Sequence, residues 1–326
     1  TDAPETPSPD LQTLAANYLI ALSPENFLSE IEAVSTALWT GDEGFFTQRD
    51  EPNADGKAAR VAGSKRLAEL GHYSGATFYY AGEWYWGVDR LFHLEARLQE
   101  LGANKTGVND YLVPRLDIDA SGVDASALTL DFYPSLNSPY TSIIFDKTMA
   151  VKNACNIAFN HKPVLPMIMR GVPATNTKGT YIFFDTKREA EFLGVPFGPI
   201  ITPIGAPTRA AYALLPWAYE QGKDEALMSS LLRAAWSEGI PLHKKSGMRR
   251  AVERAGLDWN EALQQLKRDD WRQLIAEHQN EMVEGMGLWG VPSYRLSGPD
   301  GEPDLMVWGQ DRLWLVVAEI KRRAGK

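Results

Sequence analysis

The sequence predicts an α/β chain: one complete domain of order β-α-β, helical insertion and β-β-α, preceded by a partial copy of the same domain. Two observations lead to this prediction. The motif at residues 86–92 returns at 308–314 with five of seven positions identical, and each copy follows a strand-like run and precedes a helical pattern. The second copy also has a strand, a helix and another strand before it, with a long helical stretch between. A repeat of this kind sets the organisation of the whole chain.

The complete copy begins with a strand candidate at Leu128–Tyr133, where apolar and polar residues partly alternate. A helix is expected from Pro139 to about Phe159, and a second strand at Val164–Met169. A helical region at Lys187–Leu193 and a long helical stretch from Thr208 to Met286 come next, and a hairpin and a last helix close the domain. This order is that of a thioredoxin-like fold with an inserted helical subdomain.

The first copy has the helical part, the strand candidate Ala76–Tyr80 and a closing helix from Leu91, but no opening β-α-β. The repeat implies that this opening precedes Thr1 or is missing. A stretch rich in Gly, Asn, Asp and Ser separates the copies and reads as a linker. The predicted divisions are a degenerate repeat at 1–101, a linker at 102–126 and a complete domain at 127–326, with the helical insertion at about 207–286.

Composition and charge exclude several classes of function. A formal charge of −9 argues against a nucleic-acid partner, because such proteins carry a basic surplus. No apolar run approaches the roughly 18 residues that cross a bilayer. The single cysteine, Cys155, cannot form an internal disulfide, and the histidines lack metal-ligand spacing. We therefore expect no membrane span and no metal, and a cytoplasmic location.

A candidate site lies at 137–141, between the first strand and first helix of the complete domain. Redox-active proteins place Cys-x-x-Cys at such a helix start, where the helix N-terminus lowers the pKa of the first thiol. Ser138 and Thr141 occupy these two positions here, which excludes exchange between two thiols. Ser138 followed by Pro139 also fits a purely structural N-cap with proline in the first turn. Both interpretations stay open.

A second candidate binding segment is Gly290-Val291-Pro292-Ser293, before the closing hairpin. A proline at such a strand start is expected to be cis, leaving the N–H and C=O of Val291 as an unpaired edge. An extended peptide could pair with that edge by strand addition. The first copy has Gly75-Ala76 at the equivalent place, so we expect only the second copy to bind a ligand.

Three motifs in order, Ser138-Pro139-Tyr140, Gly290-Val291-Pro292 and Gly309 to Leu313, resemble one family. It is the DsbA-related family of 2-hydroxychromene-2-carboxylate isomerases and kappa-class glutathione transferases. The resemblance covers about Leu128 to Ile320 and includes the helical insertion between the motifs. The family usually has an asparagine soon after the second strand, whereas here Asn176 lies further along the chain, so that contact is not assigned.

The resemblance implies that glutathione is the cofactor. Ser138 would donate a hydrogen bond to its sulfur, and Val291, held by Pro292, would pair with its cysteinyl backbone. Gln310 and Asp311 would hold its γ-glutamyl end. Lys178 resembles the basic residue that the family places near the peptide.

The expected function is therefore a glutathione-dependent isomerase or transferase acting on a small hydrophobic, aromatic electrophile. The alternative is a non-catalytic, duplicated thioredoxin-like binding or scaffold protein. The Asp-Arg pair at 311–312 returns as Asp89-Arg90 in the copy without the proline, so Asp311 could instead cap the last helix. The kinship also implies a homodimer, or a pseudo-dimer formed by the two copies within one chain.

Overall fold

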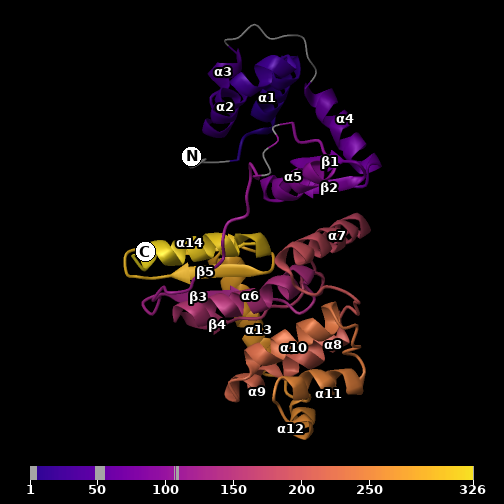
Figure 1. The fold of residues 1–326 in the computed structure, drawn as a ribbon, viewed down its shortest axis with the longest axis vertical. Coiled ribbons are helices and arrows are strands. Elements are labelled where there is room, and N and C mark those ends of the chain that lie inside the picture. Colours follow the sequence, from indigo (N-terminus) through magenta and orange to yellow (C-terminus); the bar gives the residue numbers. More distant parts are fainter. Residues whose placement is uncertain (1–5, 48–55, 106, 108–109, 326) are drawn as a thin grey trace. The chain divides into compact units, whose positions relative to one another are not determined.

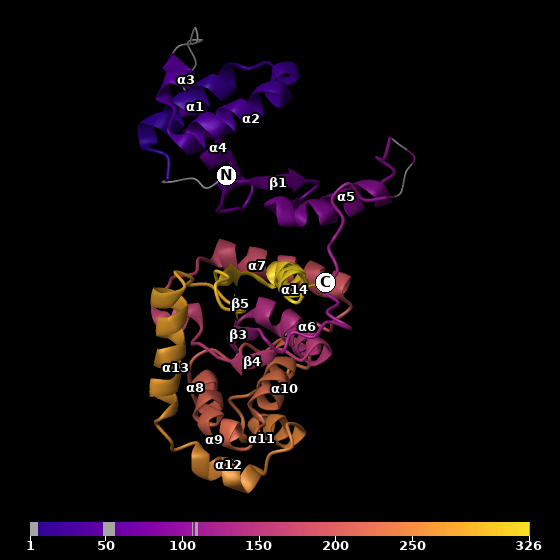
Figure 2. The same cartoon turned by 90° about the vertical axis from the view of Figure 1, so that its left-hand side faces the viewer.

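The computed structural model describes residues 6–47, 56–105, 107 and 110–325. The chain forms two compact units, Thr1–Val88 and Asp89–Lys326. Figures 1 and 2 show both units in two orthogonal views. None of the helices in the described ranges is long and apolar enough to cross a membrane.

The first unit combines a small helical cluster with a two-stranded hairpin. Serine caps begin its first two helices, since the hydroxyls of Ser8 and Ser23 accept the N–H groups of Leu11 and Asn26 and a proline follows each serine. Its described elements are α1 (Pro9–Ala21), α2 (Pro24–Thr40), α3 (Glu43–Thr47), α4 (Gly56–Glu69), β1 (Thr77–Tyr80) and β2 (Glu83–Trp86). A separate core holds the helices together, formed by Leu11, Ala15, Val34, Ala37 and Phe46.

The second unit carries a four-stranded sheet of order β4-β3-β5-β6. Strands β3 (Thr129–Tyr133) and β4 (Ala158–His161) run parallel, while β5 (Ser293–Ser297) is antiparallel to both β3 and β6 (Leu305–Trp308). The other elements are η1 (Val88–Arg90, which straddles the unit boundary), α5 (Leu91–Glu100), α6 (Pro139–Cys155), η2 (Met167–Arg170), α7 (Asn176–Leu193), η4 (Gln310–Arg312) and α14 (Leu313–Arg323). This arrangement is the predicted thioredoxin-like order.

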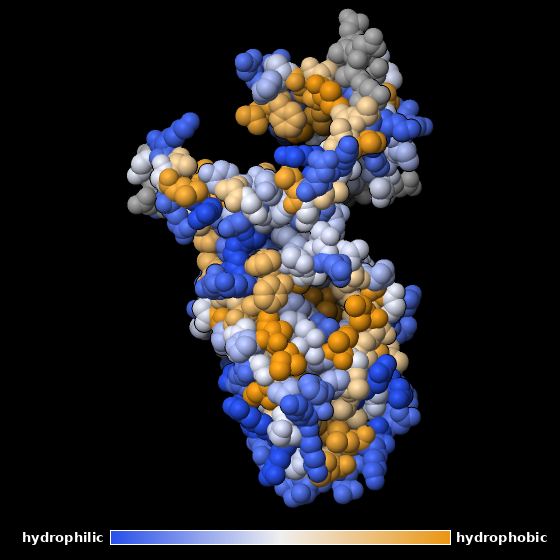
Figure 3. All heavy atoms as spheres, turned by 90° about the vertical axis from the view of Figure 1, so that its right-hand side faces the viewer, coloured by the Kyte–Doolittle hydropathy of each residue, from blue (hydrophilic) through white to orange (hydrophobic). Residues whose placement is uncertain are grey.

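The helical insertion forms a cluster of its own beyond the β4 edge of the sheet, as both ribbon views show (Figures 1 and 2). It consists of α8 (Ala206–Ala213), α9 (Leu215–Glu220), α10 (Asp224–Trp236), α11 (Lys245–Arg254), α12 (Trp259–Gln265), α13 (Trp271–Asn280) and the π-helical η3 (Glu281–Gly285). Its buried side chains join those of the sheet in one core. On the face drawn in Figure 3, the apolar side chains that stay exposed gather in patches between hydrophilic ones.

Two predicted elements are wrong in position. The helix expected to reach Phe159 ends at Cys155, because Asn156 takes the left-handed conformation (φ 53°) that terminates helices. The second strand is Ala158–His161, whereas the run predicted as a strand, Val164–Met169, ends in the 3-10 turn η2. Pro163 and Pro166 flank or interrupt that run and lack the N–H that a strand ladder needs.

The helical region expected at Lys187–Leu193 is the last part of α7, which starts at Asn176, where the hydroxyl of Thr175 caps it. The stretch predicted as a linker at 102–126 also contributes to the core. Ala120, Val123 and Ala125 are buried there, and the N–H of Ala125 donates to the carbonyl of Cys155. Small apolar residues in a polar segment can thus anchor it to the domain.

Candidate functional site

Ser138 lies at the start of α6 as its N-cap residue. Its hydroxyl oxygen accepts the N–H of Thr141 at 3.1 Å, and its backbone carbonyl accepts the N–H of Ser142. A serine hydroxyl that accepts one bond still has its own proton to donate. Ser138 is buried, with 7% of its surface exposed. Because capping uses only the hydroxyl oxygen, the capping role leaves the donor role open.

The helical insertion holds the loop before Ser138 in place. The hydroxyl of Tyr212 accepts the N–H of Leu136 at 3.1 Å and donates to the carbonyl of Val164 at 2.8 Å. The indole N–H of Trp236 donates to the carbonyl of Leu136 at 2.9 Å. Between these anchors and the helix, the buried Oδ1 of Asn137 has no hydrogen-bond partner among the described residues. Such a buried acceptor is costly unless a donor reaches it.

The segment before β5 reaches the same end of the sheet. Tyr133, the last residue of β3, pairs with Ser293, the first of β5, so the loop to Ser138 and the segment 290–292 leave the sheet side by side. The Val291–Pro292 peptide is cis, as expected. In the described part of the chain, no hydrogen bond involves the N–H or C=O of Val291. An extended ligand could therefore pair with it.

Two tryptophans and a lysine border this segment. The rings of Trp289 and Trp308 pack with centroids 5.1 Å apart, and both keep more than two fifths of their surface exposed. The Nζ of Lys178, in the first turn of α7, lies 5.4 Å from the Trp289 ring centre. A side chain at position 290 would overlap the Trp308 indole, which is why glycine stands there. The structure thus brings Lys178 to the Val291 segment and adds an exposed aromatic surface.

Gln310 and Asp311 follow β6, and the N–H of Gly309 ties them to the carbonyl of Pro292 at 3.0 Å. Gln310 is buried, and its amide donates to Glu189 at 2.8 Å. Asp311 accepts Arg90 at 2.6 Å. Its carboxylate caps no helix, since no side chain caps the start of η4 or α14, so the capping alternative for Asp311 is wrong.

The profile of DSBA-like thioredoxin domains matches residues 129–321. The chain belongs to this family. Comparison with curated proteins finds no match.

Among solved structures, the fold is similar to a 2-hydroxychromene-2-carboxylate isomerase at 20% identity, over 60% of this chain and 95% of that one, with a TM-score of 0.49. A probable DsbA oxidoreductase from Streptomyces coelicolor matches at 16% identity over 61% and 91% of the two chains, with a TM-score of 0.47. The cytosolic disulfide reductase DsbM from Pseudomonas aeruginosa matches at 17% identity over 60% and 98%, with a TM-score of 0.44.

A buried cluster of charges adjoins the start of α6, and sequence reasoning missed it. Arg90 donates to both oxygens of Asp185 at 2.8–3.0 Å and lies 3.4 Å from Glu189. The side chains of the two acids are 0% and 1% exposed. Asp185 also accepts the hydroxyl of Tyr140 at 2.7 Å, and Tyr140 lies in the first turn of α6. The cluster therefore connects α7, η4 and the helix start that carries Ser138.

Electrostatics keep both acids ionised. Burial alone raises the pKa of Asp185, but the charge and hydrogen bonds of Arg90 and the hydroxyl of Tyr140 hold it well below its usual range. Burial likewise opposes ionisation of Glu189, yet the hydrogen bond from His93 and the charges of Arg90 and Arg115 lower its pKa to about 2. Burial lowers the pKa of His93, so its ring stays neutral where a free imidazole would be protonated.

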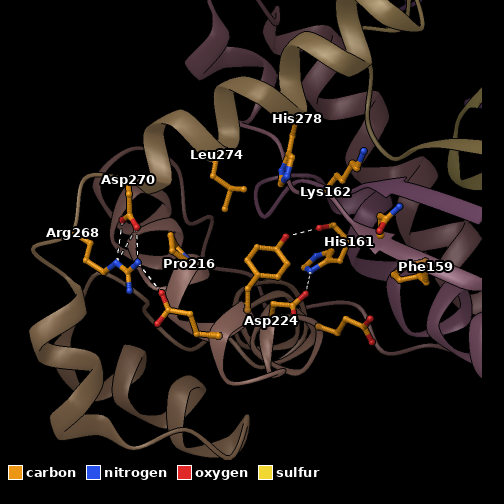
Figure 4. Close-up of a pocket in the computed structure, with 13 residues that line it drawn as sticks. Phe159, His161, Lys162, Pro216, Asp224, Arg268, Asp270, Leu274 and His278 are labelled. Carbon is orange, nitrogen blue, oxygen red and sulfur yellow. Dashed lines mark hydrogen bonds and ion pairs between the residues drawn. The ribbon is translucent and has the colours of Figure 1, made fainter.

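A pocket of about 610 Å³, lined mostly by polar residues, lies between β4 and the insertion (Figure 4). His161 lines it and bonds through Nδ1 to Asp224 at 2.7 Å, while its buried Nε2 has no partner within the described residues. Arg268 pairs with Glu220 at 2.9 Å and also with Asp270. The lining residues run from 159 to 278 with no motif, so no signal in the sequence could have assembled them.

No group of three or more potential metal ligands of the His, Cys, Asp or Glu type occurs in the described ranges. Cys155 is buried, and burial raises the pKa of its thiol. A thiol of this kind behaves as a small apolar core residue rather than a nucleophile.

Proposed function

We propose that the chain is a glutathione-dependent isomerase or transferase that acts on a small hydrophobic, aromatic electrophile. The observation that carries this proposal is the Ser138 hydroxyl, which caps α6 through its oxygen and keeps a proton to donate. It stands where a redox-active relative would carry its first cysteine, and no second thiol is available.

The residues present fit glutathione. The Val291 backbone offers a donor and an acceptor without partners in the described structure. Asp311 is 14% exposed and already accepts arginine groups, but a carboxylate has about four acceptor positions. It can still receive the ammonium of a γ-glutamyl end, beside the main chain of Gln310. Lys178 would face a carboxylate of the peptide.

Bound glutathione would supply a sulfur nucleophile that attacks an electron-poor double bond or aromatic carbon. Ser138 would donate a hydrogen bond to that sulfur, and the α6 N-terminus would favour the negative charge. A free thiol has a pKa of about 8.5, so this stabilisation raises the fraction of thiolate at neutral pH. Trp289 and Trp308 would stack on the aromatic part of the second substrate.

Calorimetric titration with glutathione tests the proposal. We expect millimolar or tighter binding to the full chain and a loss of about tenfold or more in Ser138→Ala, the cost of one hydrogen bond to a charged group. Ser142→Ala is the matched control, because its hydroxyl donates to the carbonyl of Pro139 instead. Circular dichroism checks that each variant folds. Absence of binding at several millimolar would instead support the non-catalytic scaffold.

A further inference from the structure

Two hairpins of the chain have the same local geometry. In β1–β2, Thr77 pairs with Trp86, and in β5–β6, Ser293 pairs with Trp308. The glycine after each tryptophan donates its N–H back to the residue before the first strand, to Ala76 at 2.9 Å and to Pro292 at 3.0 Å. The two segments thus agree in strand register and in the turn that follows.

The agreement continues into the helices. A 3-10 turn follows each hairpin, and its last residue starts the next helix with nearly equal dihedral angles. Arg90 has φ −107° and ψ 1°, and Arg312 has φ −107° and ψ −1°. The segments η1–α5 and η4–α14 therefore match in local geometry where each helix begins.

These two segments also contact each other through equivalent residues of the motif. Arg90 donates to Asp311 at 2.6 Å, and Arg312 donates to both oxygens of Asp89 at 2.7 and 2.8 Å. All four residues belong to the second unit. In such crossed ion pairs, the arginine of each segment binds the aspartate of the other segment. This is the pattern of a two-fold, isologous interface.

We propose that η1–α5 is a built-in partner for η4–α14, so that the chain contains within itself the interface that a symmetric dimer would form between two copies. The buried acids of α7 support this assignment. Arg90 and Arg115, which lie outside the matched residues 129–321, neutralise Asp185 and Glu189. Two fully buried carboxylates without these cations would be strongly destabilising. The DSBA-like domain therefore depends on the segment that precedes it.

The same contact makes Arg90 a positioning residue, and this part rests on the proposed function. Arg90 holds Asp185, and Asp185 accepts the hydroxyl of Tyr140, two residues after Ser138. Arg90 also holds Asp311. One guanidinium thus fixes the two elements that would grip the sulfur and the γ-glutamyl end.

The interface is tested first, without any ligand. In the full chain, Asp89→Asn and Arg312→Gln should each speed amide exchange in α5 by about two- to fivefold, as expected for an ion pair that is about 30% exposed. The double variant should exchange no faster than the faster single variant, because both changes break the same Asp89–Arg312 ion pair. Additive effects would overturn the proposal. The proposal would also fail if the wild type sedimented as a dimer and dilution of that dimer accelerated amide exchange in α14. A built-in partner leaves the chain monomeric.

The positioning role is tested by a measurement that a change in folding stability would not alter. Arg90→Lys keeps the charge but loses the forked contact with Asp185. We expect the thiol pKa of bound glutathione, followed by thiolate absorbance, to rise toward its free value, while Arg312→Lys leaves it unchanged. An unchanged pKa in Arg90→Lys would refute this role. Failure of the wild type to bind glutathione would refute the proposed function and leave the exchange experiment valid.

Discussion

Replacing Arg90 by methionine should reveal how much the buried carboxylates depend on it. Breaking a buried ion pair by removing one partner costs about 3–5 kcal/mol. Asp185 would keep the hydroxyl of Tyr140 and the cation of Arg188 at 3.1 Å, and Glu189 would keep Arg115. The loss should therefore fall at the lower end, about 3 kcal/mol at neutral pH. That is a large share of the stability of a typical domain but leaves the chain folded.

Urea denaturation at several pH values measures this loss. In the wild type, Asp185 has a depressed pKa, so its stabilising effect is present above the unfolded value and is lost as pH falls through the folded one. Without Arg90, burial dominates and the variant gains from protonation, so the difference between the two proteins should shrink in acid. Arg312→Met is the matched control, since its pair with Asp89 is about 30% exposed and is worth at most about 1 kcal/mol. Equal losses in both variants, or a loss independent of pH, would refute the reasoning.

Two further predictions concern single positions. Gly290→Ala should lower the unfolding free energy by about 1–3 kcal/mol and shift tryptophan fluorescence, because the new methyl group displaces the Trp308 indole. Gly285→Ala is the control, since nothing lies within 4 Å of a methyl group there, and equal effects of the two changes would contradict the prediction. His93→Gln should flatten the fall of stability below about pH 6.5, because the lowered pKa of His93 means that only the unfolded state takes up that proton in this range. Urea midpoints at pH 7.5 and 5.5 decide this, and an unchanged pH slope would count against it.

Local signals predicted the start of α6 and the closing hairpin, but not the start of α7. Ser138 with Pro139, and Gly290-Val291-Pro292-Ser293 before the hairpin, are patterns whose meaning depends on a few neighbouring residues. The second strand was misplaced because two short apolar runs compete after α6. The αL residue Asn156 decides between them by ending the helix early, and single sequences seldom show where an asparagine adopts that conformation.

The charged cluster lay beyond sequence reasoning for a different reason. Arg90 and Asp185 are 95 residues apart, and neither stands in a pattern that marks it as buried. Charged residues are expected at the surface, so only tertiary structure reveals that these two are enclosed together. The repeat motif did single out the Asp-Arg pairs, but not that they would face each other.

The attachment of Tyr212 has a consequence for attempts to alter what the protein accepts. This one phenol, from the first helix of the insertion, joins the loops that leave β3 and β4. Exchanging the insertion for that of a relative would thus also release the loop that presents Ser138. A graft intended to change selectivity should retain Tyr212, together with Trp236, and redesign the outer helices α11 and α12 instead.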